Sequence, residues 1–188
     1  MVNGFDAREP ANISEKLVRT RCRELVHLLG DRDITIALAE SFTAGLATYL
    51  MVDEPGAGDV VLGSAVVYDA AAKRRILGVT DGPVISARCA IEMSAGVRRH
   101  FAATSSIAWT GVAGPDTQEG QPVGTVFIST RLASHARLQW YCYVGDPNQI
   151  RLQAILDGVS ALVEMVEHAP TSARQKGPQR HRRLSGAT

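Results

Sequence analysis

The 188-residue sequence contains little cysteine, and Cys22, Cys89 and Cys142 are its three cysteines. They are odd in number, lie far apart and form no CxxC pair, which excludes a disulfide framework and a zinc site and predicts reduced thiols. No basic segment followed by an apolar run stands at the N-terminus, and no apolar run reaches the length of a membrane span. We therefore expect a cytoplasmic protein without a metal, a cofactor or a membrane partner.

Excess charge of either sign is also absent from the chain as a whole, since the formal net charge is +1. Residues 1–169 carry 15 basic and 19 acidic side chains, a net charge of −4, whereas residues 170–188 carry five Lys or Arg and no acid. An acidic body lacks the basic face of a nucleic-acid-binding domain, so we do not expect a nucleic acid as partner. A weaker alternative is an RNA contact through the basic tail.

The composition divides the chain into three parts. Residues 170–188 are rich in Pro, Gly, Ser, Thr and Gln and almost free of apolar side chains, which predicts a disordered basic tail. Residues 1–11 are expected to be a flexible N-terminus. The remaining stretch, 12–169, is long enough and apolar enough for one domain with a full core.

Apolar periodicity within 12–169 predicts strands interleaved with helices. Two consecutive strands near the end, joined by a hairpin at 133–135, imply at least one antiparallel member. The predicted fold class is α/β, a three-layer α/β/α sandwich with a mixed, mostly parallel sheet of about five strands. Strands are expected at about 34–38, 60–68, 107–109, 123–130 and 138–144, and helices at about 14–29, 43–52, 70–75, 86–101 and 148–168.

Hydroxyl side chains crowd the motif AESFTAG at 39–45, between the strand expected at 34–38 and the helix expected from Thr43. Ligands of open α/β sheets bind at the carboxyl ends of strands, and the free amides of a helix start favour an anion or a developing oxyanion. Ser41 and Thr43 are therefore candidates for ligand contact or nucleophilic attack. The alternative is that one of them only caps the helix, which taken alone is the commoner role of Ser and Thr.

Lysine is scarce, because only three of the 20 basic residues are lysines and Lys73 is the only one between positions 17 and 175. Unlike arginine, a buried lysine can lose its proton and act as a general base toward a serine hydroxyl. The alternative is a solvated side chain on a short helix beside Arg74 and Arg75. Tyr68, at the end of the preceding strand, either points into the same crevice or closes the strand.

A glycine motif, TGVAGP at 110–115, follows the strand expected at 107–109. Gly111 and Gly114 permit positive φ and close backbone approach, so that successive amides could form an anion-binding concavity. Thr110 adds a hydroxyl at the strand end. The alternative is a tight turn that needs glycine for steric reasons alone.

Five motifs together resemble one family: AESFTAG at 39–45, GSAVVYDAAAK at 63–73, SARCAIEMSAG at 86–96, TGVAGP at 110–115 and PVGTVFIS at 122–129. They resemble the C-terminal domain of the competence/damage-inducible protein CinA, in its stand-alone form, from about residue 14 to 168. The resemblance implies a mixed five-stranded sheet. It also implies hydrolysis of the carboxamide of nicotinamide mononucleotide (NMN), a pyridine nucleotide, to nicotinate mononucleotide and ammonia.

The resemblance also implies roles for single residues. Ser41 matches the nucleophile, Lys73 the amine that activates it, and Tyr68 and Thr110 match polar residues of the catalytic site. The residues expected to bind the substrate are Glu40, Thr43, Ala44, Gly45, Gly111, Ala113, Gly114 and Arg151.

The chemistry of the residues is consistent with this assignment, because a Ser–Lys pair supplies a nucleophile and a base without histidine. The five histidines lie on helices, in a hairpin turn or in the tail, and the G-x-S-x-G elbow is absent around Ser41. No metal-ligand spacing is present.

The sequence departs from the family pattern at three places. Where the family has AESCTGG, this chain has AESFTAG, with Phe42 and Ala44 in place of Cys and Gly. The loop at 116–121 is shorter than in the family, and Pro147 replaces an arginine. These departures favour an alternative, a nucleotide-binding or regulatory domain with weak or no amidase activity. A homo-oligomer is also expected to be possible.

Overall fold

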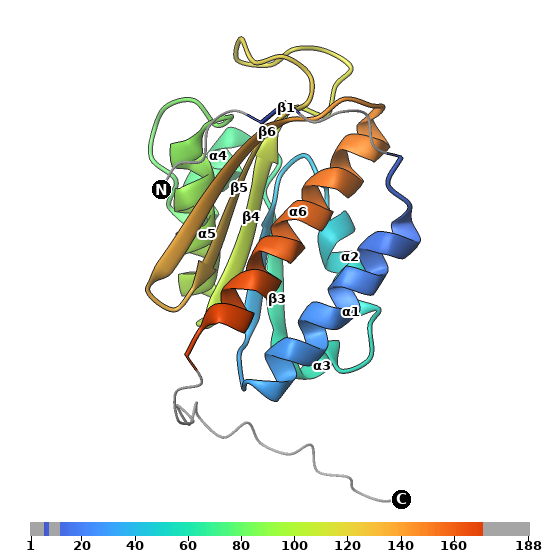
Figure 1. Ribbon diagram of the computed structural model, residues 1–188. Coiled ribbons are helices and arrows are strands. Elements are labelled where there is room, and N and C mark those ends of the chain that lie inside the picture. The colour runs from blue at the N-terminus through green and yellow to red at the C-terminus, as the bar shows by residue number, and fades with distance from the viewer. Residues whose placement is uncertain (1–5, 8–11, 171–188) are drawn as a thin grey trace, which may run out of the picture.

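The computed structural model describes residues 6–7 and 12–170, which form a three-layer α/β/α sandwich (Figure 1). The sheet has six strands in the order β1-β6-β5-β4-β2-β3, and β5 alone runs antiparallel to its neighbours. Five longer strands and a mostly parallel sheet confirm the predicted fold class. The strands are β1 (Asp6–Ala7), β2 (Ile36–Glu40), β3 (Val61–Val66), β4 (Ser105–Gly111), β5 (Thr125–Leu132) and β6 (His135–Cys142).

Helices cover both faces of the sheet (Figure 1). Successive side chains of a strand point to opposite faces, so Ile36 and Leu38 of β2 enter the core beneath one helical layer while Ala37 and Ala39 enter the other. The first layer contains α1 (Glu15–Asp31), α2 (Leu46–Val52) and α6 (Pro147–His168), with the short α3 (Ala57–Val60) leading into β3. The second contains α4 (Ala70–Leu77) and α5 (Ala87–His100).

Side chains just before the helices determine where several of them begin. Ser14 accepts a hydrogen bond from Leu17 N at the start of α1, and Ser86 accepts one from Cys89 N at the start of α5. Serine is a common residue at this position of a helix, because its hydroxyl satisfies a free amide of the first turn. Asp146 caps α6, whose first turn contains Pro147, a residue that suits a position where no amide partner is needed.

Two expected boundaries are wrong by three residues: the start of β6, expected at 138 and observed at His135, and the start of the helix after β2. The predicted helix start at Thr43 is wrong, because α2 begins only at Leu46. Ala44 and Gly45 have positive φ values of 54° and 94°, which place the chain in the left-handed region and keep it out of the helix. β2 itself lies two residues later than expected and ends on Glu40. α3 begins between the helix expected at 43–52 and the strand expected at 60–68, where no helix was expected.

The position of β2 determines where a ligand can enter. β2 lies between β3 and β4 in the sheet. Its connection to β3 runs through α2 and α3 on one face, and the connection from β3 to β4 runs through α4 and α5 on the other (Figure 1). Such a reversal opens a crevice at the carboxyl ends of the strands.

The terminal predictions fall mostly outside the described residues. Within 1–11 the structure describes only β1, which pairs with Tyr141 and Cys142 of β6, and the tail expected at 170–188 is described only at Pro170. None of the described helices combines the length and the apolar character needed to cross a bilayer.

Candidate active site

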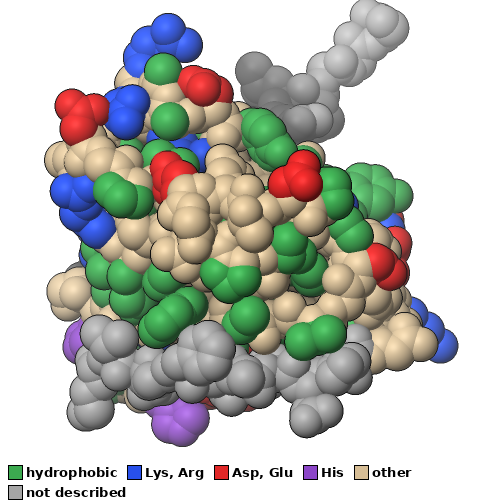
Figure 2. All heavy atoms as spheres, turned by 90° about the horizontal axis from the view of Figure 1, so that it is seen from above, with side chains coloured by type: hydrophobic (Ala, Val, Ile, Leu, Met, Phe, Trp, Pro, Cys, Tyr) green, Lys and Arg blue, Asp and Glu red, His purple; other side chains and the backbone are tan. Residues whose placement is uncertain are grey.

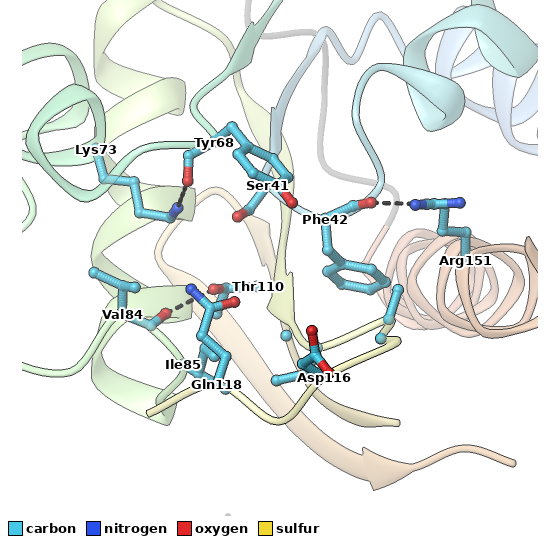
Figure 3. Close-up of a pocket in the computed structure, with 14 residues that line it drawn as sticks. Ser41, Phe42, Tyr68, Lys73, Val84, Ile85, Thr110, Asp116, Gln118 and Arg151 are labelled. Carbon is cyan, nitrogen blue, oxygen red and sulfur yellow. Dashed lines mark hydrogen bonds between the residues drawn. The ribbon is translucent and has the colours of Figure 1, made fainter. Parts of the chain in front are cut away.

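A pocket lies at the carboxyl ends of three neighbouring parallel strands (Figure 3). Ser41 directly follows β2, Tyr68 follows β3, and Thr110 is in the last part of β4. Lys73 enters the same pocket from α4. Including its open mouth, the pocket encloses about 540 Å³ of space that no atom fills. Figure 2 looks onto this edge from above, where uncharged and hydrophobic side chains surround scattered acidic ones.

Ser41 is not a helix cap. Its amide donates to the carbonyl of Trp109 at 3.2 Å, and its hydroxyl has no hydrogen-bond partner among the described residues. The N-cap residue of α2 is Gly45, and neither the Ser41 nor the Thr43 side chain forms a capping hydrogen bond to this helix. The capping alternative is therefore wrong for both residues, and the Ser41 hydroxyl faces the pocket (Figure 3).

The amides at the start of α2 are satisfied by Glu40 instead. Its fully buried carboxylate accepts hydrogen bonds from the amides of Gly45, Ala47 and Thr48 at 2.9, 3.1 and 2.8 Å, and from the Thr48 hydroxyl. A negative charge at a helix N-terminus is stabilised by the helix dipole. Glu40 thus holds the turn that carries Ser41.

Four of the predicted substrate-binding residues do not line this pocket, although all four are described: Glu40, Thr43, Ala44 and Gly45. Glu40 points into the start of α2, and the Thr43 hydroxyl is buried without a partner. Ala44 and Gly45 belong to the left-handed turn before α2. The other four residues, Gly111, Ala113, Gly114 and Arg151, do line the pocket.

Lys73 is buried, with 1% of its surface exposed, so the solvated alternative is wrong. Its Nζ donates a hydrogen bond to the backbone oxygen of Tyr68 at 2.9 Å. Burial lowers the pKa of the Lys73 amine, and the smaller effects of Cys89, Asp69 and Glu119 oppose this shift. Figure 3 shows the amine pointing into the space beside Ser41, and no hydrogen bond joins the two among the described residues.

Tyr68 and Thr110 contribute to the pocket in different ways. Tyr68 is 76% exposed at the mouth, while its backbone oxygen accepts the hydrogen bond from Lys73. Thr110 is 1% exposed, and its hydroxyl donates to the carbonyl of Val84 at 2.6 Å. This bond attaches the end of β4 to the segment of Val84 and Ile85, which forms one wall. The hydroxyl proton of Thr110 is thus used in the hydrogen bond to Val84, so the geometry favours a positioning role for this residue.

The glycines of TGVAGP meet two structural demands. A Cβ at Gly111 would lie 2.4 Å from the backbone oxygen of Thr125 in β5, so the steric alternative applies there. Gly114 has a φ of 96°, which an L side chain rarely adopts. Ala113 and Gly114 line the pocket, and their amides donate to no other described group. They could therefore donate to a ligand anion.

Arg151 reaches the pocket from α6. Its Nε donates to the carbonyl of Phe42 at 2.9 Å, and its guanidinium has no acidic partner among the described residues. Sequence reasoning did not assign six further lining residues to the site: Phe42, Val84, Ile85, Val112, Asp116 and Gln118. Asp116 and Gln118 directly follow TGVAGP, a position that could have revealed them, whereas no motif marks Val84 and Ile85.

The fold and the pocket define a class: a three-layer α/β protein with a buried amine and an unpartnered hydroxyl in one polar pocket at the carboxyl edge of its sheet. The model of the CinA C-terminal domain family matches residues 19–166. The chain therefore belongs to the CinA C-terminal domain family.

Individual relatives agree with this membership. The chain is 35% identical over 152 residues to a "Putative competence-damage inducible protein" of Bacillus pumilus, covering 78% of this chain and 36% of that protein. It is 37% identical over 150 residues to a "CinA-like protein" of Frankia casuarinae, covering 77% and 35%. The chain thus spans about a third of the length of these curated relatives.

Solved structures of the same superfamily match most of this chain and nearly all of their own chains. The CinA superfamily protein of Klebsiella pneumoniae is similar with a TM-score of 0.78 and 26% identity, covering 81% of this chain and 99% of that one. A second CinA superfamily structure, from Enterobacter cloacae, has a TM-score of 0.76 and 26% identity, covering 88% and 98%.

Proposed function

We propose that this protein is an amidohydrolase that converts NMN and water to nicotinate mononucleotide and ammonia, with Ser41 as nucleophile and Lys73 as general base. The observation that carries the proposal is the placement of a desolvated amine and an unpartnered hydroxyl in one pocket. A neutral amine accepts a proton at neutral pH, which a solvated lysine does not.

In the first half-reaction, the neutral Lys73 amine takes the proton of the Ser41 hydroxyl while Oγ forms a bond to the carboxamide carbon. The electron pair of the C=O bond moves to oxygen and gives a tetrahedral oxyanion. The C–N bond then breaks and the Lys73 ammonium returns its proton to the departing nitrogen. Ammonia leaves, and the acyl group remains as an ester on Ser41.

In the second half-reaction, water attacks the ester carbon and gives a proton to Lys73. The bond between the carbon and Oγ breaks, and Lys73 returns the proton to Oγ. Nicotinate mononucleotide is released, and both side chains regain their starting states. One group thus acts as base and then as acid in each half-reaction.

Two further groups support this chemistry. The free amides of Ala113 and Gly114 are the candidate donors to the oxyanion. The guanidinium of Arg151 is the candidate partner of the substrate phosphate, because Arg binds phosphate through charge-assisted hydrogen bonds. Phe42 keeps that guanidinium in place through its carbonyl.

The test is ammonia release from NMN by the purified chain, compared with its variants. Ser41→Ala and Lys73→Ala are expected to lower kcat by about 10²–10⁴-fold. Lys73→Arg keeps the charge but cannot deprotonate usefully, so it is expected to be as inactive as Lys73→Ala. The double variant Ser41→Ala/Lys73→Ala should be no worse than Ser41→Ala, since residues that act as a unit are not additive.

Two results would contradict the proposal in different ways. Full activity of Lys73→Arg would exclude Lys73 as the base. Absence of ammonia release from NMN by the unmodified chain would exclude the function itself.

A second candidate is a nucleotide-binding or regulatory domain without turnover. The observation that favours it is the hydrogen bond of Lys73 to Tyr68 rather than to Ser41. Saturable binding of NMN without ammonia release, unchanged by Ser41→Ala, would support this second function.

A further inference from the structure

One charged residue of the pocket has no part in the chemistry proposed above. Three charged side chains line the pocket: Lys73, Arg151 and Asp116. Asp116 is exposed at the pocket mouth, and its carboxylate forms no ion pair within the described part of the chain. A carboxylate repels the phosphate that Arg151 would bind, so its presence beside a nucleotide needs an explanation.

Asp116 and Arg151 do not neutralise each other. Figure 3 shows them on different sides of the Phe42 ring, and Arg151 is held by the carbonyl of Phe42. Because no ion pair joins the two, the pocket presents one negative and one positive group at separate places. A ligand with one charge of each sign would complement this arrangement.

Two aromatic side chains line the pocket, and one of them lies near the Asp116 carboxylate. Phe42 and Tyr68 both belong to its wall, and Figure 3 shows the Asp116 side chain below the Phe42 ring. The face of an aromatic ring attracts a cation. The Asp116 carboxylate and the Phe42 ring therefore favour positive charge in the same part of the pocket.

NMN has a charge pattern of this kind, because its pyridine nitrogen is bonded to ribose and carries a positive charge while its phosphate is negative. We propose, on the basis of the function proposed above, that Asp116 is a specificity-determining residue that selects carboxamides on a cationic ring. Arg151 takes the phosphate, and Asp116 discriminates against neutral rings of the same shape.

The test compares NMN with its 1,4-dihydro form, which keeps the carboxamide, ribose and phosphate but has a neutral ring. Dissociation constants are measured by calorimetry at low salt on the full chain with Ser41→Ala, which prevents turnover. Adding Asp116→Asn is expected to raise the Kd of NMN about two- to fivefold, as for an exposed ion pair, and to leave that of the dihydro form unchanged. Adding Arg151→Gln should raise both.

Asp59→Asn is the matched control, because it removes an equally solvated acid on α3, far from the pocket lining. It should change neither Kd. In the chain that keeps Asp116, the preference for NMN over the dihydro form should become smaller in 0.5 M salt (about 4 Å Debye length), because salt screens exposed charges.

The outcomes separate this inference from the proposed function. An equal effect of Asp116→Asn on both ligands, or no effect on NMN, would overturn the role of Asp116. If the expected pattern is found but the chain with Ser41 releases no ammonia, the role of Asp116 stands and the amidohydrolase fails. If neither ligand binds, both are overturned.

Discussion

The Nζ atom of Lys73 lies 2.9 Å from the backbone oxygen of Tyr68. This bond joins the first turns of α4 to the end of β3, and it holds the amine inside the pocket. A neutral amine that donates one N–H to this oxygen keeps its lone pair for another proton. The same contact is therefore compatible with a base that acts on Ser41.

The pH dependence of activity is expected to report Lys73. Since the proposed base must be neutral, kcat/KM should rise with pH through a pKa that burial holds below the usual value of 10.5. The Asp69 carboxylate opposes this shift, so Asp69→Asn should move the rise in kcat/KM to lower pH. Asn also caps helices well, so α4 should persist.

The control for this profile is Asp81→Asn, which removes an exposed carboxylate paired with Arg74. Its pH profile should match that of the unmodified chain. An equal shift in both variants would mean that net charge, rather than Asp69, sets the profile.

The stability of the fold is expected to depend on pH through the same amine. Because burial lowers the pKa of Lys73 in the folded chain, the unfolded chain binds more protons between that pKa and about 10.4. The free energy of unfolding therefore rises with pH there, by up to about 1.4 kcal/mol per pH unit. Lys73→Met lacks this dependence. The Tm of Lys73→Met minus that of the unmodified chain should therefore fall as the pH rises through this range toward 10, and a difference that stays constant would contradict this expectation.

Glu40 is expected to stabilise the fold without contacting substrate. Glu40→Gln replaces a buried acceptor of four hydrogen bonds by a neutral amide. Because hydrogen bonds to charged groups are strong and the site is dry, we expect a loss of about 1.5–3 kcal/mol in the free energy of unfolding. Urea denaturation measures it. The KM for NMN, measured well below the Tm, should differ by less than about twofold from that of the unmodified chain, because Glu40 does not line the pocket.

Gly158 is expected to be intolerant of a side chain. A Cβ there would lie 2.6 Å from Nε1 of Trp109, a fully buried indole that donates to the carbonyl of Ala154. Gly158→Ala should therefore cost about 1–3 kcal/mol, because overpacking shifts a rigid neighbour. Gly58→Ala is the control, since nothing lies within 4 Å of its added methyl group. If both variants melt at the same temperature, the packing between α6 and β4 is looser than this distance implies.

The fold class and the order of the elements could be predicted from apolar periodicity alone. The boundaries could not, and β2 shows why. Its last residue is Glu40, a charged side chain that local patterning places outside a buried strand. It is buried because three amides and a hydroxyl of the α2 region surround its carboxylate, and that compensation exists only after the chain has folded.

The candidate site was partly predictable for a related reason. Ser41, Tyr68 and Thr110 follow or end parallel strands, and the carboxyl ends of such strands meet at one edge of a sheet. Val84 and Ile85 line the pocket because the Thr110 hydroxyl, 26 residues further along the chain, donates a hydrogen bond to the carbonyl of Val84. No local pattern encodes such a contact.

The amino-acid sequence alone determined which side chains could do chemistry here: the only lysine between positions 17 and 175, hydroxyls at strand ends and glycines that permit close approach. Those properties are local and follow from residue type and spacing. Only the tertiary structure decided that Lys73 is dry, that Ser41 is free rather than a cap, and that Glu40 faces α2 instead of the pocket. Burial and hydrogen-bond partners come from segments distant in the chain, so they exist only when the sheet has formed.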